Sequence, residues 1–121
     1  MATGIGAGIR PSQLHRLERA YSFRELHHEL RVAVEELIKQ ADEDLAAICT
    51  VHEVETNIEI LLNDQYGLSE LLESRASEYR DFFEQYLDRV KCYDHRQEIS
   101  HAVIVRCMQV AYKQLLCKLE V

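Results

Sequence analysis

Turn-forming residues are scarce in this 121-residue sequence, which contains one proline and four glycines, and tryptophan is absent. A β-sandwich needs a turn signal every few residues, so the shortage argues against that fold class. No apolar run approaches the roughly 20 residues of a membrane-spanning helix, and we expect no membrane partner. Three of the glycines are Gly4, Gly6 and Gly8. We therefore expect residues 1–9 to be a flexible N-terminal segment and residues 10–121 to form a single helical-bundle domain.

Positive charge is also in short supply, because 14 lysines and arginines face 21 aspartates and glutamates, giving a net charge of −7. A nucleic-acid binder neutralises phosphates with basic side chains, so we expect no nucleic-acid partner. Residues 1–24 hold four arginines and one glutamate, a balance of +3, and the remainder carries −10. A basic front and an acidic body could pair between copies of the chain or dock an acidic partner, although a solvated surface is the simpler interpretation.

The stretch from Ile99 to Leu119 is apolar over most of its circumference when it is drawn as a helix. A surface helix presents an apolar arc of roughly 100°. Because the arc here is wider, we expect this helix to be covered on two sides, by other helices of the chain or by a partner. Its polar side chains gather on one stripe, formed by Arg106, Gln109, Lys113, Gln114 and Lys118.

Helix-start signals divide the first half of the chain. Pro11 suits the first position of a short helix that continues to Ala20. Ser22 and Glu25 have the spacing of a capping box, which predicts a second helix from Phe23 to about Cys49.

A break or kink is expected at Thr50, because Thr50 and Glu53 form another possible capping box and the apolar residues move to a different face there. The alternative is one uninterrupted helix from Phe23 to Tyr66, about 65 Å long. Gly67 predicts a helix end, and a further helix is expected from Glu70 to Cys92.

Asp94 can cap the last helix, which contains the apolar stretch from Ile99 onward. Together these patterns predict an all-α fold, an antiparallel bundle of four helices preceded by a short N-terminal helix. A bundle of three helices with one long first helix is the alternative.

Four cysteines lie within or at the ends of apolar helical patterns, which is typical of reduced thiols in the cytoplasm or nucleus. They are Cys49, Cys92, Cys107 and Cys117. Two of them form Cys-x-x-His pairs, Cys49 with His52 and Cys92 with His95, close to predicted helix joints. Zinc favours sulfur and nitrogen ligands, so these four residues are a candidate zinc set. Buried cysteines and exposed histidines are the favoured interpretation, and we expect no cofactor.

No nucleotide loop, hydrolase elbow or metalloprotease motif is present, so we expect neither enzymatic activity nor a small-molecule substrate. The excess of apolar helix surface predicts a non-enzymatic protein–protein interaction module, a homo-oligomerising scaffold or an adaptor subunit of an intracellular complex. A zinc-binding sensor or switch is the alternative function. The candidate interaction residues are Tyr79, Phe82, Tyr86, Val105, Tyr112 and Leu116.

Overall fold

The computed structural model describes residues 9–64, 68, 70, 72 and 96–119. Within these residues the chain forms five helices of defined bounds and no strand. The helices are α1 (Pro11–Ala20), α2 (Phe23–Ala41), α3 (Glu43–Ile48), α4 (Val51–Asn63) and α7 (Arg96–Leu119). The all-α fold class predicted from the sequence is confirmed.

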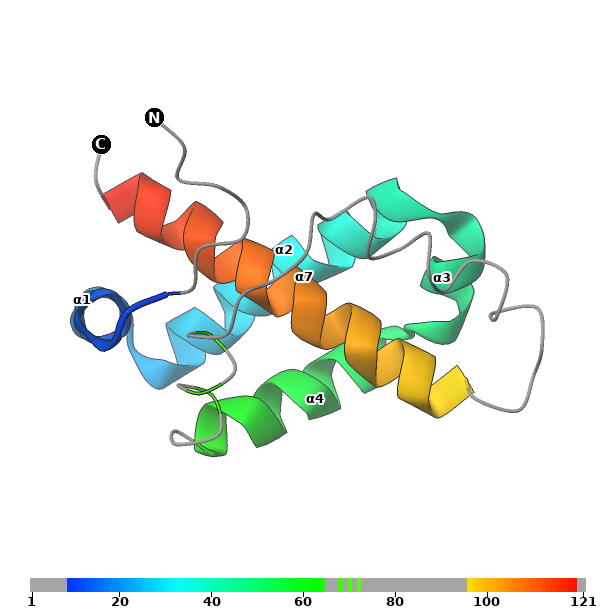
Figure 1. Cartoon of the computed structure of the whole chain (residues 1–121), viewed down its shortest axis with the longest axis horizontal. Helices are drawn as coiled ribbons and strands as arrows, with labels where there is room; N and C mark the ends of the chain where they lie inside the picture. Colours follow the sequence, from blue (N-terminus) through cyan, green and yellow to red (C-terminus); the bar gives the residue numbers. More distant parts are fainter. Residues whose placement is uncertain (1–8, 65–67, 69, 71, 73–95, 120–121) are drawn as a thin grey trace.

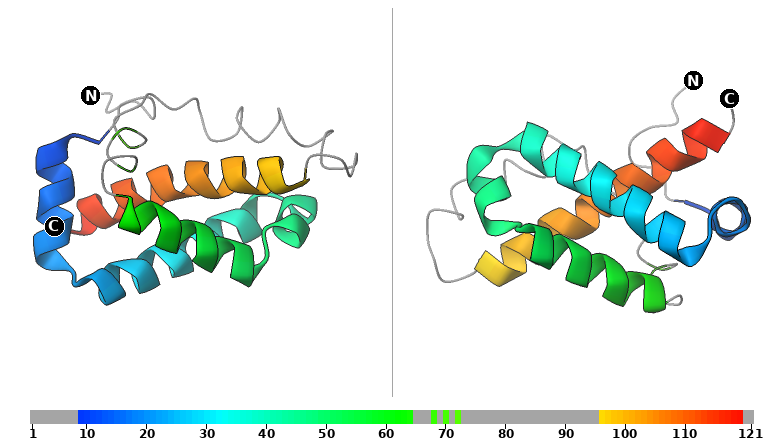
Figure 2. Two further views of the ribbon diagram at one scale, coloured as in Figure 1. Left: turned by 90° about the horizontal axis from the view of Figure 1, so that it is seen from below. Right: turned by 180° about the vertical axis from the view of Figure 1, so that it is seen from behind.

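α7 is the helix around which the others are arranged. α2 and α4 run in opposite directions, with α3 forming the turn between them (Figure 1). α7 packs across both α2 and α4, and it also contacts α1 and α3 (Figures 1 and 2). α1 stands across one end of this arrangement, beside the start of α2 and the last turns of α7 (Figure 2, left).

The first two helices begin where local sequence signals predict. Pro11 occupies the first turn of α1, and the backbone N–H of Arg10 donates to Gln13 Oε1 at 2.9 Å. At the start of α2, the N–H of Glu25 donates to Ser22 Oγ at 3.2 Å, and the N–H of Ser22 donates to Glu25 Oε1 at 3.1 Å. These two reciprocal bonds confirm the predicted capping box.

The prediction of one helix from Phe23 to about Cys49 is wrong at Asp42. Asp42 has an extended backbone that ends α2 and starts α3. Its Oδ1 accepts hydrogen bonds from the N–H groups of Asp44, at 2.8 Å, and Leu45, at 3.2 Å. Aspartate satisfies free N–H groups at a helix start in this way, so a strong local cap outweighs a continuous apolar pattern.

The predicted break at Thr50 is confirmed. Thr50 is the residue before α4, and its Oγ1 accepts from the N–H of Glu53 at 3.3 Å. The alternative of one long helix from Phe23 to Tyr66 is therefore wrong, because the chain leaves the helical conformation at both Asp42 and Thr50.

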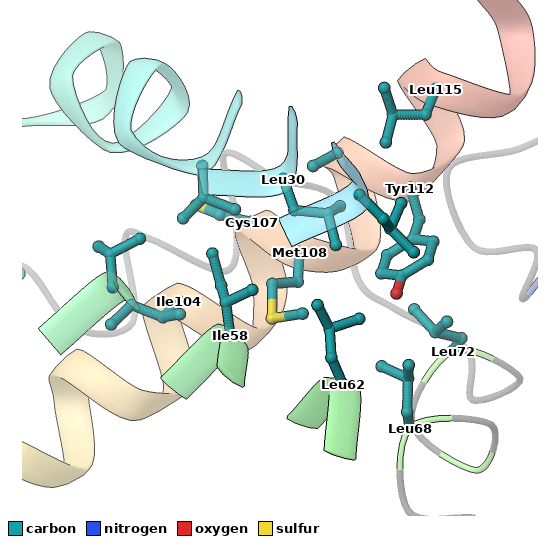
Figure 3. Close-up of a cluster of buried hydrophobic side chains, with 14 of the residues drawn as sticks. Leu30, Ile58, Leu62, Leu68, Leu72, Ile104, Cys107, Met108, Tyr112 and Leu115 are labelled. Atoms are coloured by element: carbon teal, nitrogen blue, oxygen red, sulfur yellow. The ribbon is translucent and has the colours of Figure 1, made fainter. Parts of the chain in front are cut away.

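The core is centred on α7, as its wide apolar arc predicted. Four consecutive residues, Arg106 to Gln109, are buried, and four residues span a full helical turn. Figure 3 draws Met108 of α7 among Leu30 of α2 and Ile58 and Leu62 of α4, all of them buried. α7 is thus enclosed on every side at this level.

The polar stripe of α7 is buried in its first part. Arg106 is only 3% exposed, and its Nη1 donates to Gln109 Oε1 at 3.2 Å. Partial burial lowers the pKa of Lys113, and the neighbouring positive charge of Arg106 lowers it further. Only the last part of the stripe, Gln114 and Lys118, is exposed to solvent.

Some predicted features fall outside the described residues. These are most of the N-terminal segment, the helix end at Gly67, the cap at Asp94 and most of the predicted helix from Glu70 to Cys92. Ile9 is described and buried, and its N–H donates to the carbonyl oxygen of Leu72 at 2.6 Å. Within the described part of the chain, no helix combines the length and the apolar character needed to cross a membrane.

Candidate interaction surface

The candidate interaction residues on α7 lie mainly in the core. Tyr112 has no exposed area, Leu116 is buried and Val105 is half-buried. The two buried side chains therefore pack within this chain. The other three candidates, Tyr79, Phe82 and Tyr86, lie outside the described residues.

Of the candidate zinc set, only Cys49 and His52 are described. Cys49 is buried at the end of α3, where its Sγ donates to the carbonyl oxygen of Ser100 at 3.9 Å, whereas His52 is exposed. Burial raises the pKa of Cys49 to about 11, which disfavours the thiolate that zinc requires. Among the described residues, no group of three or more histidine, cysteine, aspartate or glutamate side chains could hold a metal ion. Cys92 and His95 lie outside these residues.

A surface groove of about 410 Å³ lies between α2 and the last turns of α7. We call it the α2–α7 groove. Its floor is apolar and consists of Ala33 and Leu37 from α2 with Leu115 from α7, and Val32 also lines it from the outer face of α2. Leu115 is buried, Ala33 and Leu37 are half-buried, and Val32 is 48% exposed. Val32 is therefore an apolar side chain that this chain leaves largely uncovered.

The two rims of the α2–α7 groove differ in charge. The α2 rim carries Glu29, Glu36 and Gln40, and the α7 rim carries Gln114 and Lys118. An apolar floor between charged rims is the arrangement in which a groove accepts the apolar face of another helix. The acidic and basic rims would also orient such a helix, because opposite charges attract across an interface.

Three other large apolar side chains are more than half exposed among the described residues: Phe23 53%, Val51 55% and Ile60 60%. None of the three lines the α2–α7 groove. Ile60 of α4 is therefore a suitable comparison for Val32, since it shares the apolar character and the exposure but lacks the groove.

The sequence contained one signal for this surface. Val32 departs from the row of core residues that α2 buries, which is Leu26, Leu30, Val34 and Ile38. It lies on the opposite side of the helix, among charged residues. An apolar residue on a charged helix face is the sequence pattern expected of an exposed apolar side chain.

The comparisons with known proteins add no functional information. No protein-family model, no curated protein and no solved structure matches this chain.

Proposed function

We propose that this chain is a non-enzymatic protein–protein interaction module, and that it forms a homodimer through the α2–α7 groove. The observation that carries the proposal is the apolar floor of the groove between two rims of different charge, with Val32 largely exposed beside the acidic rim. A second copy of the chain is the occupant that the charges favour.

The charge argument depends on symmetry. In a two-fold dimer the same surface of each copy forms the interface. A two-fold axis parallel to the groove sets the α2 rim of each copy against the α7 rim of the other. Glu29 and Glu36 then lie opposite Lys118 of the second copy, and the pairing occurs twice. The two apolar floors meet between these pairs, at the centre of the interface, where residues contribute most to affinity.

The first test is the oligomeric state of the full chain, measured by size-exclusion chromatography with light scattering over a range of concentrations. We expect a dimer, and we expect Val32→Glu to weaken it by at least about tenfold, because it buries an unpaired carboxylate in the interface. Ile60→Glu makes the same change on α4 outside the groove and should leave the dimer intact. A wild-type monomer at the highest concentration reached would refute the homodimer, as would equal effects of the two variants.

Charge exchange tests the orientation. Glu36→Lys places a lysine against Lys118 of the second copy, and Lys118→Glu places a glutamate against the acidic rim, so each single variant should weaken the dimer. The double variant restores opposite charges and should recover most of the affinity. Additive losses in the double variant would argue against the two-fold arrangement.

We also propose the finer architecture, an antiparallel bundle of four helices in which residues 70–92 supply the helix that completes α2, α4 and α7.

A cytoplasmic or nuclear location is part of the proposal. It is supported by Cys49 and Cys117, which are free thiols. Dimer formation through the α2–α7 groove is compatible with both a homo-oligomerising scaffold and an adaptor subunit.

A further inference from the structure

A second hollow lies apart from the α2–α7 groove and shares no residue with it. This pocket has a volume of about 310 Å³ and lies between α1, the first turns of α2, the end of α4 and α7. Much of its wall is apolar and includes Leu14, Leu26, Leu62 and Leu68. Small-molecule pockets have volumes of roughly 300–1,000 Å³ and combine apolar walls with a few polar groups. The pocket is at the small end of that range.

Tyr112 supplies a buried polar group to this pocket. Its side chain forms part of the wall and has no area exposed to solvent. Its hydroxyl group is buried without a hydrogen-bond partner in the described structure. Figure 3 shows that the hydroxyl points away from α7, toward Leu62, Leu68 and Leu72. Buried tyrosine hydroxyls normally have a partner, so this one is suited to a group that enters the pocket.

The charges around the pocket restrict what can enter. Burial raises the pKa of Tyr112, and the negative charge of Glu18 raises it further. The hydroxyl therefore stays protonated at neutral pH and can donate a hydrogen bond. Glu18 also lines the pocket, and its Oε2 lies 3.5 Å from Nδ1 of His15, another lining residue. A carboxylate at this position repels an anionic ligand and tolerates a neutral one.

We propose that this pocket binds a small neutral molecule with an apolar body and one carbonyl, ether or hydroxyl oxygen, which accepts a hydrogen bond from Tyr112. The apolar walls cover the body of the ligand, and the unpartnered hydroxyl selects for the oxygen. This binding is independent of dimer formation at the α2–α7 groove.

Acetophenone and benzoate test the proposal, because they share a ring and differ in the charge of the polar group. Each is titrated into the full chain with labelled leucine methyl groups and followed by NMR. Acetophenone should shift the methyl signals of Leu14, Leu26 and Leu62 and leave those of Leu45, a buried leucine of α3 outside the pocket, unchanged. Benzoate should bind several-fold more weakly. The proposal is overturned if acetophenone shifts no pocket methyl, or if benzoate binds equally well.

Two variants test the roles of the polar groups. Tyr112→Phe removes the hydroxyl and should weaken acetophenone binding by about fivefold, the usual effect of one hydrogen bond. Without ligand, the melting temperature of this variant should stay the same or rise, because a buried group without a partner has been removed. A lower melting temperature would show that the hydroxyl already has a partner within the chain, and unchanged affinity would also refute its role. Glu18→Gln should strengthen benzoate binding and leave acetophenone binding unchanged, and any other pattern contradicts the assigned charge selectivity.

Discussion

The buried thiol of Cys49 is expected to react slowly, although its position next to a helix start could suggest a reactive cysteine. Burial raises its pKa to about 11, against an ordinary value near 8.5. At pH 8 its thiolate is therefore on the order of 100-fold rarer than that of an ordinary cysteine. Cys117, on α7, is exposed. We expect iodoacetamide to alkylate Cys49 at least about 100-fold more slowly than Cys117.

Mass spectrometry of the two cysteine-containing peptides over time measures this ratio. For Cys49 the rate should rise about tenfold for each pH unit up to its pKa, since only the thiolate reacts. Similar rates for Cys49 and Cys117 at pH 8 would contradict the burial of Cys49. Stoichiometric zinc in protein purified without chelator, lost on Cys49→Ser, would instead support the zinc hypothesis.

Single residues were predictable from the sequence when their role is local. Ser22, Glu25 and Thr50 act on backbone groups within three positions, so their spacing alone predicts their hydrogen bonds. Tyr112 could not be assigned in the same way. The residues around it belong to α1, α2 and α4 and include Leu68. The residue spacing within one segment cannot predict that these parts of the chain come into contact.

At the scale of the helix, the cap at Asp42 is expected to stabilise the chain. Its Oδ1 accepts two backbone hydrogen bonds at the start of α3. Asp42→Ala leaves both N–H groups without this partner and should lower the free energy of unfolding by about 1 kcal/mol. Asp42→Asn keeps an acceptor oxygen and should retain most of the stability, although it removes the charge.

Urea denaturation followed by circular dichroism measures these differences. Glu43→Ala is the matched control, because it removes the neighbouring exposed carboxylate, for which no capping hydrogen bond is seen. A loss for Glu43→Ala as large as that for Asp42→Ala would mean that charge, and not the cap, carries the effect.

The buried face of α2 shows why helix packing was harder to predict than helix ends. Helices that run nearly parallel bury residues at alternating spacings of three and four. The buried residues are instead four apart throughout, Leu26, Leu30, Val34 and Ile38, and such a row winds obliquely around the helix. α7 crosses α2 (Figure 2), and a crossing helix packs along an oblique row. Phe23, three residues before Leu26, does not belong to this row and is 53% exposed.

For the whole molecule, the sequence predicted that α7 is the central helix, but it did not predict which faces of the other helices pack against α7. The wide apolar arc of α7 required cover on more than one side, and α7 contacts α1, α2, α3 and α4. The angles at which the helices cross decide which side chains remain at the surface. These angles cannot be derived from the residue spacing within one helix. The α2–α7 groove and the pocket beside α1 depend on those angles, so both could be identified only from the structure.

If packing against α7 stabilises both α2 and α4, a cavity-forming substitution at the centre of α7 should destabilise the two helices together. Met108 has no exposed area and packs among side chains of both helices (Figure 3). Met108→Ala should lower the free energy of unfolding by about 2–5 kcal/mol, the usual cost of such a cavity. Hydrogen exchange should then show the amides of α2 and α4 losing protection by the same amount as those of α7, because the three helices unfold as one unit. Cys117→Ser, an exposed change on the same helix outside the α2–α7 groove, should leave protection unchanged. Loss of protection confined to α7 would mean that α2 and α4 form a stable unit without it, and that α7 only covers them.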